Sequence, residues 1–191
     1  MPSAVGYQPT LNSEMGAHNN HLRVAHLNTV SIPKHRDEIQ RVICETDLDI
    51  LCTSETNIKT GTPAKRYNIP GYKLIKKNRE YGAKGGIGIY FKDIYKPKKI
   101  EIRYDGLQPE LIFTEVEINK NKVAIGVIYK SPSTSYGIYA EIQEILAFIT
   151  TKYSHVMILG DFNIDFLKND RPKEFFKEVI LQPFALHQVI K

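Results

Sequence analysis

One short stretch limits the possible folds of this chain more than any other: an apolar run that ends abruptly in polar side chains. The run from Val156 to Leu159 is short for a helix and fits a buried strand. Gly160 then lets the backbone turn or be approached closely. In an extended chain, the period of two would place Asp161 and Asn163 on one side of the backbone. Alternatively, either side chain caps the next turn, and this stretch leaves both explanations open.

Length and composition favour one folded domain with a mildly basic surface. The chain has 191 residues, of which 42% are apolar, and this is enough for a sizeable core. We expect residues 1–21 to form a flexible leader and residues 22–191 to form the domain. The net charge of +5 and the isoelectric point near 9.0 indicate an anionic partner, such as nucleic acid or a phosphate-bearing substrate.

The cysteines and the lack of targeting patterns indicate the cellular context. Cys44 and Cys52 lie in apolar surroundings, so we expect two buried free thiols rather than a disulfide or a metal pair. No stretch is long and apolar enough to cross a membrane, and the N-terminus lacks the pattern of a secretion signal. The expected location is therefore intracellular, in the nucleus or cytoplasm, without a membrane partner.

Hydrophobic periodicity predicts strands and helices in an order typical of layered proteins. Helices are predicted over residues 33–46, 139–152 and 171–180. Strands are predicted over residues 22–28, 50–53, 72–77, 85–91, 98–103, 111–118, 122–129 and 156–159, and residues 186–190 are expected to start another. The opening order of strand, helix and strand indicates a layered arrangement. The glycines at 85–88 favour a close-packed hairpin over a phosphate-binding loop, because no helix follows them.

Polar side chains follow four of the predicted strands. They are Asn28, Glu55, Tyr129 and the pair Asp161 and Asn163. Strand exits in layered folds are where functional sites gather. Carboxylates bind Mg²⁺ or orient a water, whereas amides and phenols donate hydrogen bonds to phosphoryl oxygens. Each residue alone also fits a structural role in a turn, a cap or a sheet edge, and only the recurrence favours a site.

Five segments in this order resemble the endonuclease/exonuclease/phosphatase superfamily. They are Leu27-Asn28, Ser54-Glu55-Thr56, Gly85 to Tyr90, Val127 to Pro132 and Leu159 to Asn163. The sequence is most similar to the apurinic-endonuclease-like domains of non-LTR retrotransposons, over residues 22–190. The resemblance implies an α+β fold, a four-layer α-β-β-α sandwich with two mixed sheets flanked by helices. It also implies phosphodiester hydrolysis with Mg²⁺ or Mn²⁺.

The resemblance assigns a role to each polar residue at a strand exit. Glu55 would be the metal ligand and Asn28 would assist at the metal site. Tyr129 and Asn163 would hold the phosphate, and Asp161 would orient the attacking water. These four catalytic residues, Asn28, Tyr129, Asp161 and Asn163, together with Glu55 are the predicted site.

The sequence departs from the superfamily pattern at two places. Family members continue with a Ser-x-Asp segment and an Asp-His pair, and this sequence has neither before Lys191. None of its six histidines occupies the matching position, so we expect weakened catalysis, a sandwich without its last strands and one exposed sheet edge. The aspartate that usually follows the first asparagine by two residues is replaced by Val30.

The middle of the chain is rich in basic residues. We predict that DNA phosphates bind to Lys73, Lys76, Lys77, Arg79 and Lys84, with nearby tyrosines available for stacking. The alternative is a solvated face on which lysines discourage pairing of strand edges.

These observations lead to one principal functional hypothesis and two alternatives. The chain is expected to be a divalent-metal-dependent, DNA-nicking endonuclease of retrotransposon type, which would work with a reverse transcriptase module encoded downstream. The first alternative is a non-catalytic remnant that binds nucleic acid or a protein partner. The second is a phosphatase that acts on lipid or inositol phosphates.

Overall fold

Two four-stranded mixed sheets form the centre of the protein. The computed structural model describes residues 21–79, 85–103 and 109–189. The first sheet has the order β1-β2-β4-β3, with β1 (Val24–Asn28), β2 (Ile50–Ser54), β3 (Tyr72–Lys77) and β4 (Ile87–Lys92). The second has the order β5-β6-β7-β8, with β5 (Lys98–Lys99), β6 (Glu110–Ile118), β7 (Asn121–Tyr129) and β8 (His155–Asp161).

The two sheets pack face to face through a shared apolar core. Ile50, Cys52 and Phe91 from the first sheet belong to the same buried cluster as Ile112 and Val127 from the second. These strands are apolar on both faces because their outer faces are covered as well. Each fully buried aliphatic or aromatic side chain contributes roughly 1.5–3 kcal/mol to the free energy of unfolding.

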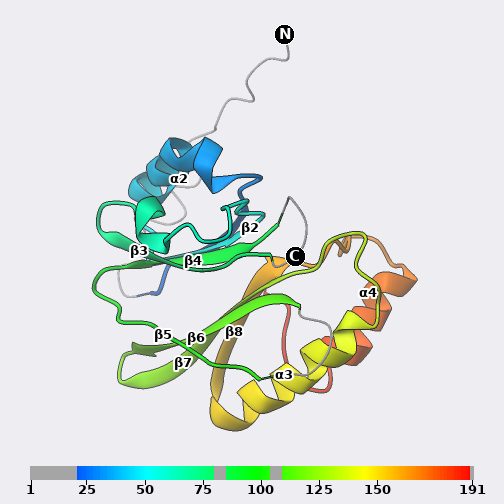
Figure 1. The fold of residues 1–191 in the computed structure, drawn as a ribbon. Coiled ribbons are helices and arrows are strands. Elements are labelled where there is room, and N and C mark those ends of the chain that lie inside the picture. The colour runs from blue at the N-terminus through cyan, green and yellow to red at the C-terminus, as the bar shows by residue number, and fades with distance from the viewer. Residues whose placement is uncertain (1–20, 80–84, 104–108, 190–191) are drawn as a thin grey trace.

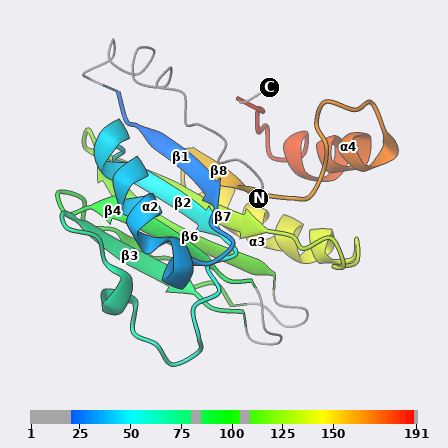
Figure 2. The ribbon, with the colours of Figure 1, turned by 90° about the horizontal axis from the view of Figure 1, so that it is seen from above.

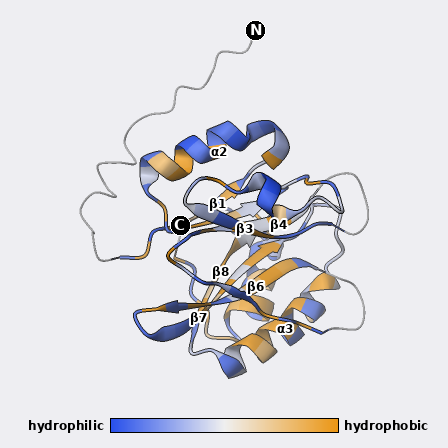
Figure 3. Cartoon of the chain, turned by 60° about the vertical axis from the view of Figure 1, so that its left-hand side comes forward, coloured by the Kyte–Doolittle hydropathy of each residue, from blue (hydrophilic) through white to orange (hydrophobic). Residues whose placement is uncertain are grey.

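Helices cover the outer face of each sheet, which completes four layers (Figure 1). Helix α2 (Ile32–Thr46) lies on the first sheet and buries Ile39 and Ile43 against it. Helix α3 (Ile138–Lys152) lies on the second sheet, beside α4 (Arg171–Phe176) and the π-helical turn η2 (Lys177–Leu181). Figure 3 shows the resulting hydropathy pattern, with hydrophilic residues on the outer side of α2. The predicted α-β-β-α sandwich is confirmed.

Parallel pairing brings the polar strand exits to one end of the sandwich. β1 pairs parallel with β2, and Asn28 aligns with Ser54 in register. β7 pairs parallel with β8, and Tyr129 aligns with Asp161. In the part of the chain that the structure describes, β1 and β8 are outer strands of their sheets and contact each other (Figure 2). The four exits therefore meet where the two sheets meet.

Gly160 is required by this close approach of β8 to its neighbour. Its backbone has φ of +158°, and a Cβ atom there would lie 1.8 Å from the carbonyl oxygen of Ile128. Only glycine leaves room for β7 at this point. The residue before Asp161 thus keeps the exits of β7 and β8 aligned.

Three sequence-based predictions were wrong. The strand predicted over 98–103 is limited to Lys98–Lys99, although the Ile100 amide still donates to the Phe113 carbonyl. Residues 186–189 form no strand, and Leu186 instead packs beside the α3 cluster. Cys44 is exposed because it lies on the outer side of α2, whereas Cys52 is buried as expected and both thiols are free.

Candidate functional site

The amide of Asn28 joins two carboxylates from different sheets. Asn28 Nδ2 lies 3.1 Å from Glu55 Oε1 and 3.3 Å from Asp161 Oδ2. Its own Oδ1 accepts a hydrogen bond from the backbone amide of Val30, which fixes the orientation of the side chain. The structure therefore brings together three residues that the sequence separates by as many as 133 positions.

Tyr129 completes this group from the exit of β7. Its hydroxyl donates to Glu55 Oε1 over 2.9 Å. Burial and the neighbouring Glu55 carboxylate raise the pKa of Tyr129, while Arg79, whose guanidinium lies 5.9 Å from the ring centroid, opposes this rise. The phenol is therefore neutral at physiological pH and available as a hydrogen-bond donor.

Asn163 does not continue the strand in the extended form. Its φ is +51°, and its backbone amide donates to Asp161 Oδ1 over 2.9 Å, so Asp161 caps the turn. The Asn163 side chain donates to the Lys130 carbonyl over 2.8 Å. The alternative explanation of the opening stretch thus holds for the local geometry, while Asp161 Oδ2 still faces Asn28. The role of Asn163 in phosphate binding stays a prediction.

Several residues around the site adopt the left-handed backbone conformation. Val30, Glu55 and Asn57 have φ values of 53°, 51° and 48°. Positive φ is costly for residues other than glycine, and most of all for a β-branched one. The Asn57 side-chain amide donates to the Val30 carbonyl, and Thr29 Oγ1 donates to the Ser54 carbonyl over 3.0 Å. These contacts hold the loops after β1 and β2 in a strained form that presents Glu55.

The carboxylate oxygens of this group are suitable ligands for a small hard cation. Glu55 Oε1 accepts two hydrogen bonds, whereas Oε2 has none in the described chain. The donors to these two carboxylates, Asn28, Tyr129 and the Asn163 amide, are all neutral, so the group carries negative charge that no ion pair among the described residues compensates. Mg²⁺ is commonly held by one or two carboxylates together with water and substrate oxygens. Within residues 21–79, 85–103 and 109–189, no cluster of three or more histidine, cysteine or acidic ligands exists. Glu55, assisted by Asn28, is the group that would hold the ion, and Asp161 lies beside it.

His26 is a neighbour of the site that the sequence did not single out. It precedes Asn28 by two residues on β1, so both side chains lie on the same face of the strand. Burial lowers the pKa of His26, and the Asp161 carboxylate opposes this effect. Its Nε2 is buried without a hydrogen-bond partner among the residues described. The alternation Val24, His26, Asn28 was the available signal.

The predicted basic residues do not share one set of partners in the structure. Lys73 lies on β3 within 3.8 Å of Asp93, and Lys76 Nζ donates to Asn78 over 2.8 Å. Lys77 donates to the Pro109 carbonyl over 3.3 Å. Arg79 forms an ion pair with Glu110 and lies 5.9 Å from the Tyr129 ring centroid, next to a strand exit. The remaining predicted residue, Lys84, lies outside the described residues. Their binding to DNA stays a prediction.

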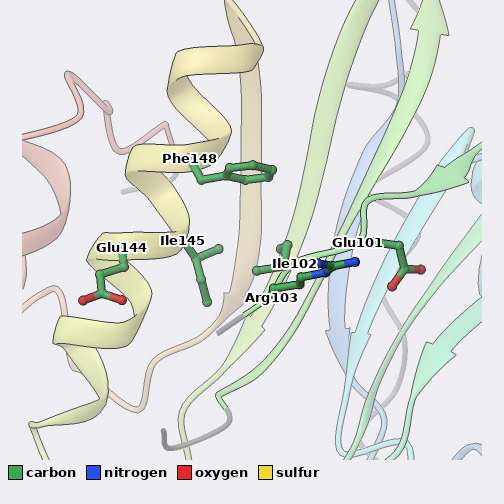
Figure 4. Close-up of a pocket in the computed structure, with 6 residues that line it drawn as sticks. All are labelled: Glu101, Ile102, Arg103, Glu144, Ile145 and Phe148. Carbon is green, nitrogen blue, oxygen red and sulfur yellow. The ribbon is translucent and has the colours of Figure 1, made fainter. Parts of the chain in front are cut away.

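A cavity of about 360 Å³ lies elsewhere, on the outer side of the second sheet (Figure 4). It is lined by Glu101, Ile102, Arg103, Glu144, Ile145 and Phe148, none of which belongs to the predicted site.

As for membranes, the helices in the described ranges are too short or too polar to span a bilayer.

The fold matches solved structures of nucleases and phosphatases. An apurinic/apyrimidinic endonuclease from Leishmania major is 13% identical with a TM-score of 0.67; the match covers 85% of this chain and 66% of that one. The endonuclease domain of TRAS1, a telomere-specific non-LTR retrotransposon, is 12% identical with a TM-score of 0.63, over 90% and 74% of the two chains. A mannosyl-6-phosphatase from Bacteroides thetaiotaomicron is 15% identical with a TM-score of 0.62, over 83% and 70%.

These likenesses concern the fold. No protein-family model and no curated protein sequence matches the chain. The chain spans 66 to 74% of the length of the three structures described above. The predicted resemblance to the endonuclease/exonuclease/phosphatase superfamily is confirmed at the level of the fold. By their names the three structures are enzymes of different kinds, so the shared fold does not define a substrate.

Proposed function

We propose that the chain is a divalent-metal-dependent phosphodiester hydrolase that nicks DNA, as an endonuclease of retrotransposon type. The observation that carries the proposal is the convergence of Glu55 and Asp161 on the Asn28 amide. The fold shared with the TRAS1 endonuclease domain supports it. A reverse transcriptase module remains the expected partner, and the nucleus or cytoplasm the expected location.

Each residue of the group has a distinct part in the proposed reaction. Glu55 and Asn28 would hold Mg²⁺ or Mn²⁺, and the bound ion would supply charge neutralisation at the phosphoryl oxygens. Asp161, already oriented by Asn28 and by the Asn163 amide, would accept a hydrogen bond from the attacking water. The water oxygen forms a bond to phosphorus as the bond to the leaving oxygen breaks. Asp161 takes one water proton, and the leaving oxygen keeps the electron pair of the broken bond and takes a proton from solvent.

Tyr129 would stabilise the same phosphoryl group as a neutral donor. Its raised pKa keeps the proton on the hydroxyl, so the phenol adds no negative charge beside the phosphate. Its hydrogen bond to Glu55 Oε1 holds the carboxylate in place before substrate arrives. Preorganised donors of this kind typically contribute about 3–4 kcal/mol to transition-state stabilisation.

The net charge of +5 supports DNA as the substrate, because sequence-independent binding to DNA is mainly electrostatic. The test is supercoiled-plasmid nicking by the purified chain in Mg²⁺, in Mn²⁺ and in EDTA, beside phosphate release from inositol phosphates. Nicking that EDTA abolishes would support the proposal. Salt-dependent DNA binding without nicking would instead favour the non-catalytic alternative, and release of phosphate alone would favour the phosphatase.

A further inference from the structure

Lys130 is a buried cation that the proposed reaction does not use. It follows Tyr129 directly at the exit of β7 and is only 7% exposed. Lysine is rarely this buried unless it is paired with an anion. Because Lys130 lies next to the site, a bound substrate is a candidate for the anion that pairs with it.

Among the residues that the structure describes, none forms an ion pair with Lys130. In the chain as described, no carboxylate lies within ion-pair distance of Lys130 Nζ. Its polar partner is the Ser131 carbonyl, at the long distance of 3.5 Å, and the ring of Tyr136 lies 5.3 Å away. Burial lowers the pKa of Lys130, and no neighbouring charge counters this effect. The fold thus holds an ammonium group at a cost in hydration.

Three hydroxyl groups lie in the segment that follows. Ser131 Oγ is 3.1 Å from Ser133 Oγ and 2.8 Å from Thr134 Oγ1. A hydroxyl group can rotate to donate to an incoming oxygen anion. An ammonium and a set of hydroxyls are together the groups that bind a phosphate oxygen.

The backbone of Lys130 is tied to the proposed catalytic residues. Its amide donates to the Asp161 carbonyl over 2.9 Å, and its carbonyl accepts from the Asn163 side chain over 2.8 Å. The position of Lys130 relative to Asp161 is therefore fixed. Tyr136, which covers the ammonium, is 51% exposed, and the lysine stem is flexible. Rotation of one of these side chains is what the ammonium needs to reach a phosphate at the surface.

We propose that Lys130, with the hydroxyls of Ser131, Ser133 and Thr134, binds a DNA backbone phosphate adjacent to the one hydrolysed. This subsite rests on the proposed function, because it would hold the same strand in register with Glu55 and Asp161. It makes no contact with bases and therefore contributes affinity without sequence preference.

The test is the salt dependence of binding to a short fluorescent DNA duplex in EDTA. One phosphate contact contributes about 0.9 to the slope of log affinity against log salt concentration. Lys130→Gln should reduce the slope by about that amount and weaken binding about fivefold near physiological salt. Lys130→Arg should retain the slope. Lys120→Gln is the matched control, because Lys120 lies in the turn at the other end of β7 and should leave the slope unchanged.

Thermal unfolding separates this role from a structural one. Lys130→Met removes a cation that burial destabilises, so it should keep or raise the melting temperature while it weakens DNA binding. A lower melting temperature with an unchanged salt slope would overturn the inference.

If the wild type nicks DNA but Lys130→Gln keeps the full slope, the subsite is wrong and the proposed function stands. If Lys130→Gln lowers the slope but no nicking occurs, Lys130 binds a DNA backbone phosphate, and the proposed hydrolysis is contradicted together with the placement of Lys130 beside a hydrolysed phosphate. If the wild type binds no DNA at low salt, both are contradicted.

Discussion

Asn28 on β1 of the first sheet donates a hydrogen bond over 3.3 Å to Asp161 at the end of β8 in the second. The same nitrogen also lies 3.1 Å from Glu55 Oε1. One neutral amide therefore stands between two carboxylates that would otherwise repel each other. This arrangement links the stability of the site to the charge at position 28.

Asn28→Asp should destabilise the metal-free protein and make it responsive to cations. The variant replaces a donor with a third carboxylate, which should lower the free energy of unfolding by about 2 kcal/mol in EDTA. Mg²⁺ should restore more stability to this variant than it adds to the wild type. Thermal unfolding in EDTA and in Mg²⁺ measures both effects.

Asn119→Asp is the control for that experiment, because it makes the same substitution in the turn between β6 and β7, away from the site. It should show no gain in its response to Mg²⁺. If Mg²⁺ stabilised the two variants equally, Asn28 would not be near a cation site.

Tyr129→Phe should slow nicking by about 100-fold or more, because the phosphoryl group loses a preorganised donor that rests on Glu55 in the free protein. The raised pKa of Tyr129 gives the pH dependence a definite sign. An acid whose pKa is raised by folding stays protonated through pH 10.0, its ordinary value, and any stability it contributes declines only above that pH. Tyr129 should therefore cause no loss of activity as the pH rises from 8 to about 10.

Spectrophotometric titration of the tyrosines in EDTA checks the ionisation directly. The difference between wild type and Tyr129→Phe should show a phenol that ionises above pH 10.0. A phenol that ionised below that value would contradict the assignment of Tyr129 as a neutral donor.

Gly160→Ala should cost at least about 3 kcal/mol of stability, because its Cβ would lie 1.8 Å from the Ile128 carbonyl oxygen. Gly137→Ala is the matched control. Gly137 has φ of −56°, and a Cβ there would meet nothing closer than Ser135 Oγ at 3.5 Å. Urea denaturation should give Gly137→Ala a stability within about 0.5 kcal/mol of the wild type. Equal stability of the two variants would show that β7 and β8 do not approach as described.

The sequence predicts the elements whose signal is local and misses the contacts between distant strands. β3 has the predicted bounds, Tyr72–Lys77, because its alternation of apolar and polar residues is a local signal. Gly160 also signalled a close approach correctly. The contact between β1 and β8 could not be read from either strand, since it depends on how two separate sheets stack.

The meeting of four residues at one end of the sheets could also be predicted from the positions of the strand exits. Asn28, Glu55, Tyr129 and Asp161 come together because strand exits share one end of each sheet. The sequence left an extended chain and a capped turn open at Asn163, and the structure has the turn, because the Asp161 side chain accepts from the Asn163 amide and the extended backbone ends there. The exposure of Cys44 and the ion pair between Arg79 and Glu110 depend on packing between segments distant in sequence.

Val30→Gly should stabilise the protein by about 1 kcal/mol. Val30 is β-branched, has φ of 53° and is 60% exposed, so the substitution relieves backbone strain and removes little buried surface. Val30→Asn should recover part of this gain and Val30→Ala less, since asparagine tolerates positive φ better than alanine. Chemical denaturation gives the order. A loss of stability in Val30→Gly would mean that the valine side chain contributes packing that outweighs the strain.

Glu55 is the residue on which the proposed metal-dependent hydrolysis of phosphodiesters depends. The most direct measurement is the initial rate of supercoiled-plasmid nicking in Mg²⁺ by the wild type, Glu55→Gln and the control Glu38→Gln, whose side chain is exposed on α2. Glu55→Gln preserves shape but removes the charge that would hold the ion. We predict a fall of at least about 100-fold for Glu55→Gln and an unchanged rate for Glu38→Gln. Equal nicking by wild type and Glu55→Gln would contradict the proposed site.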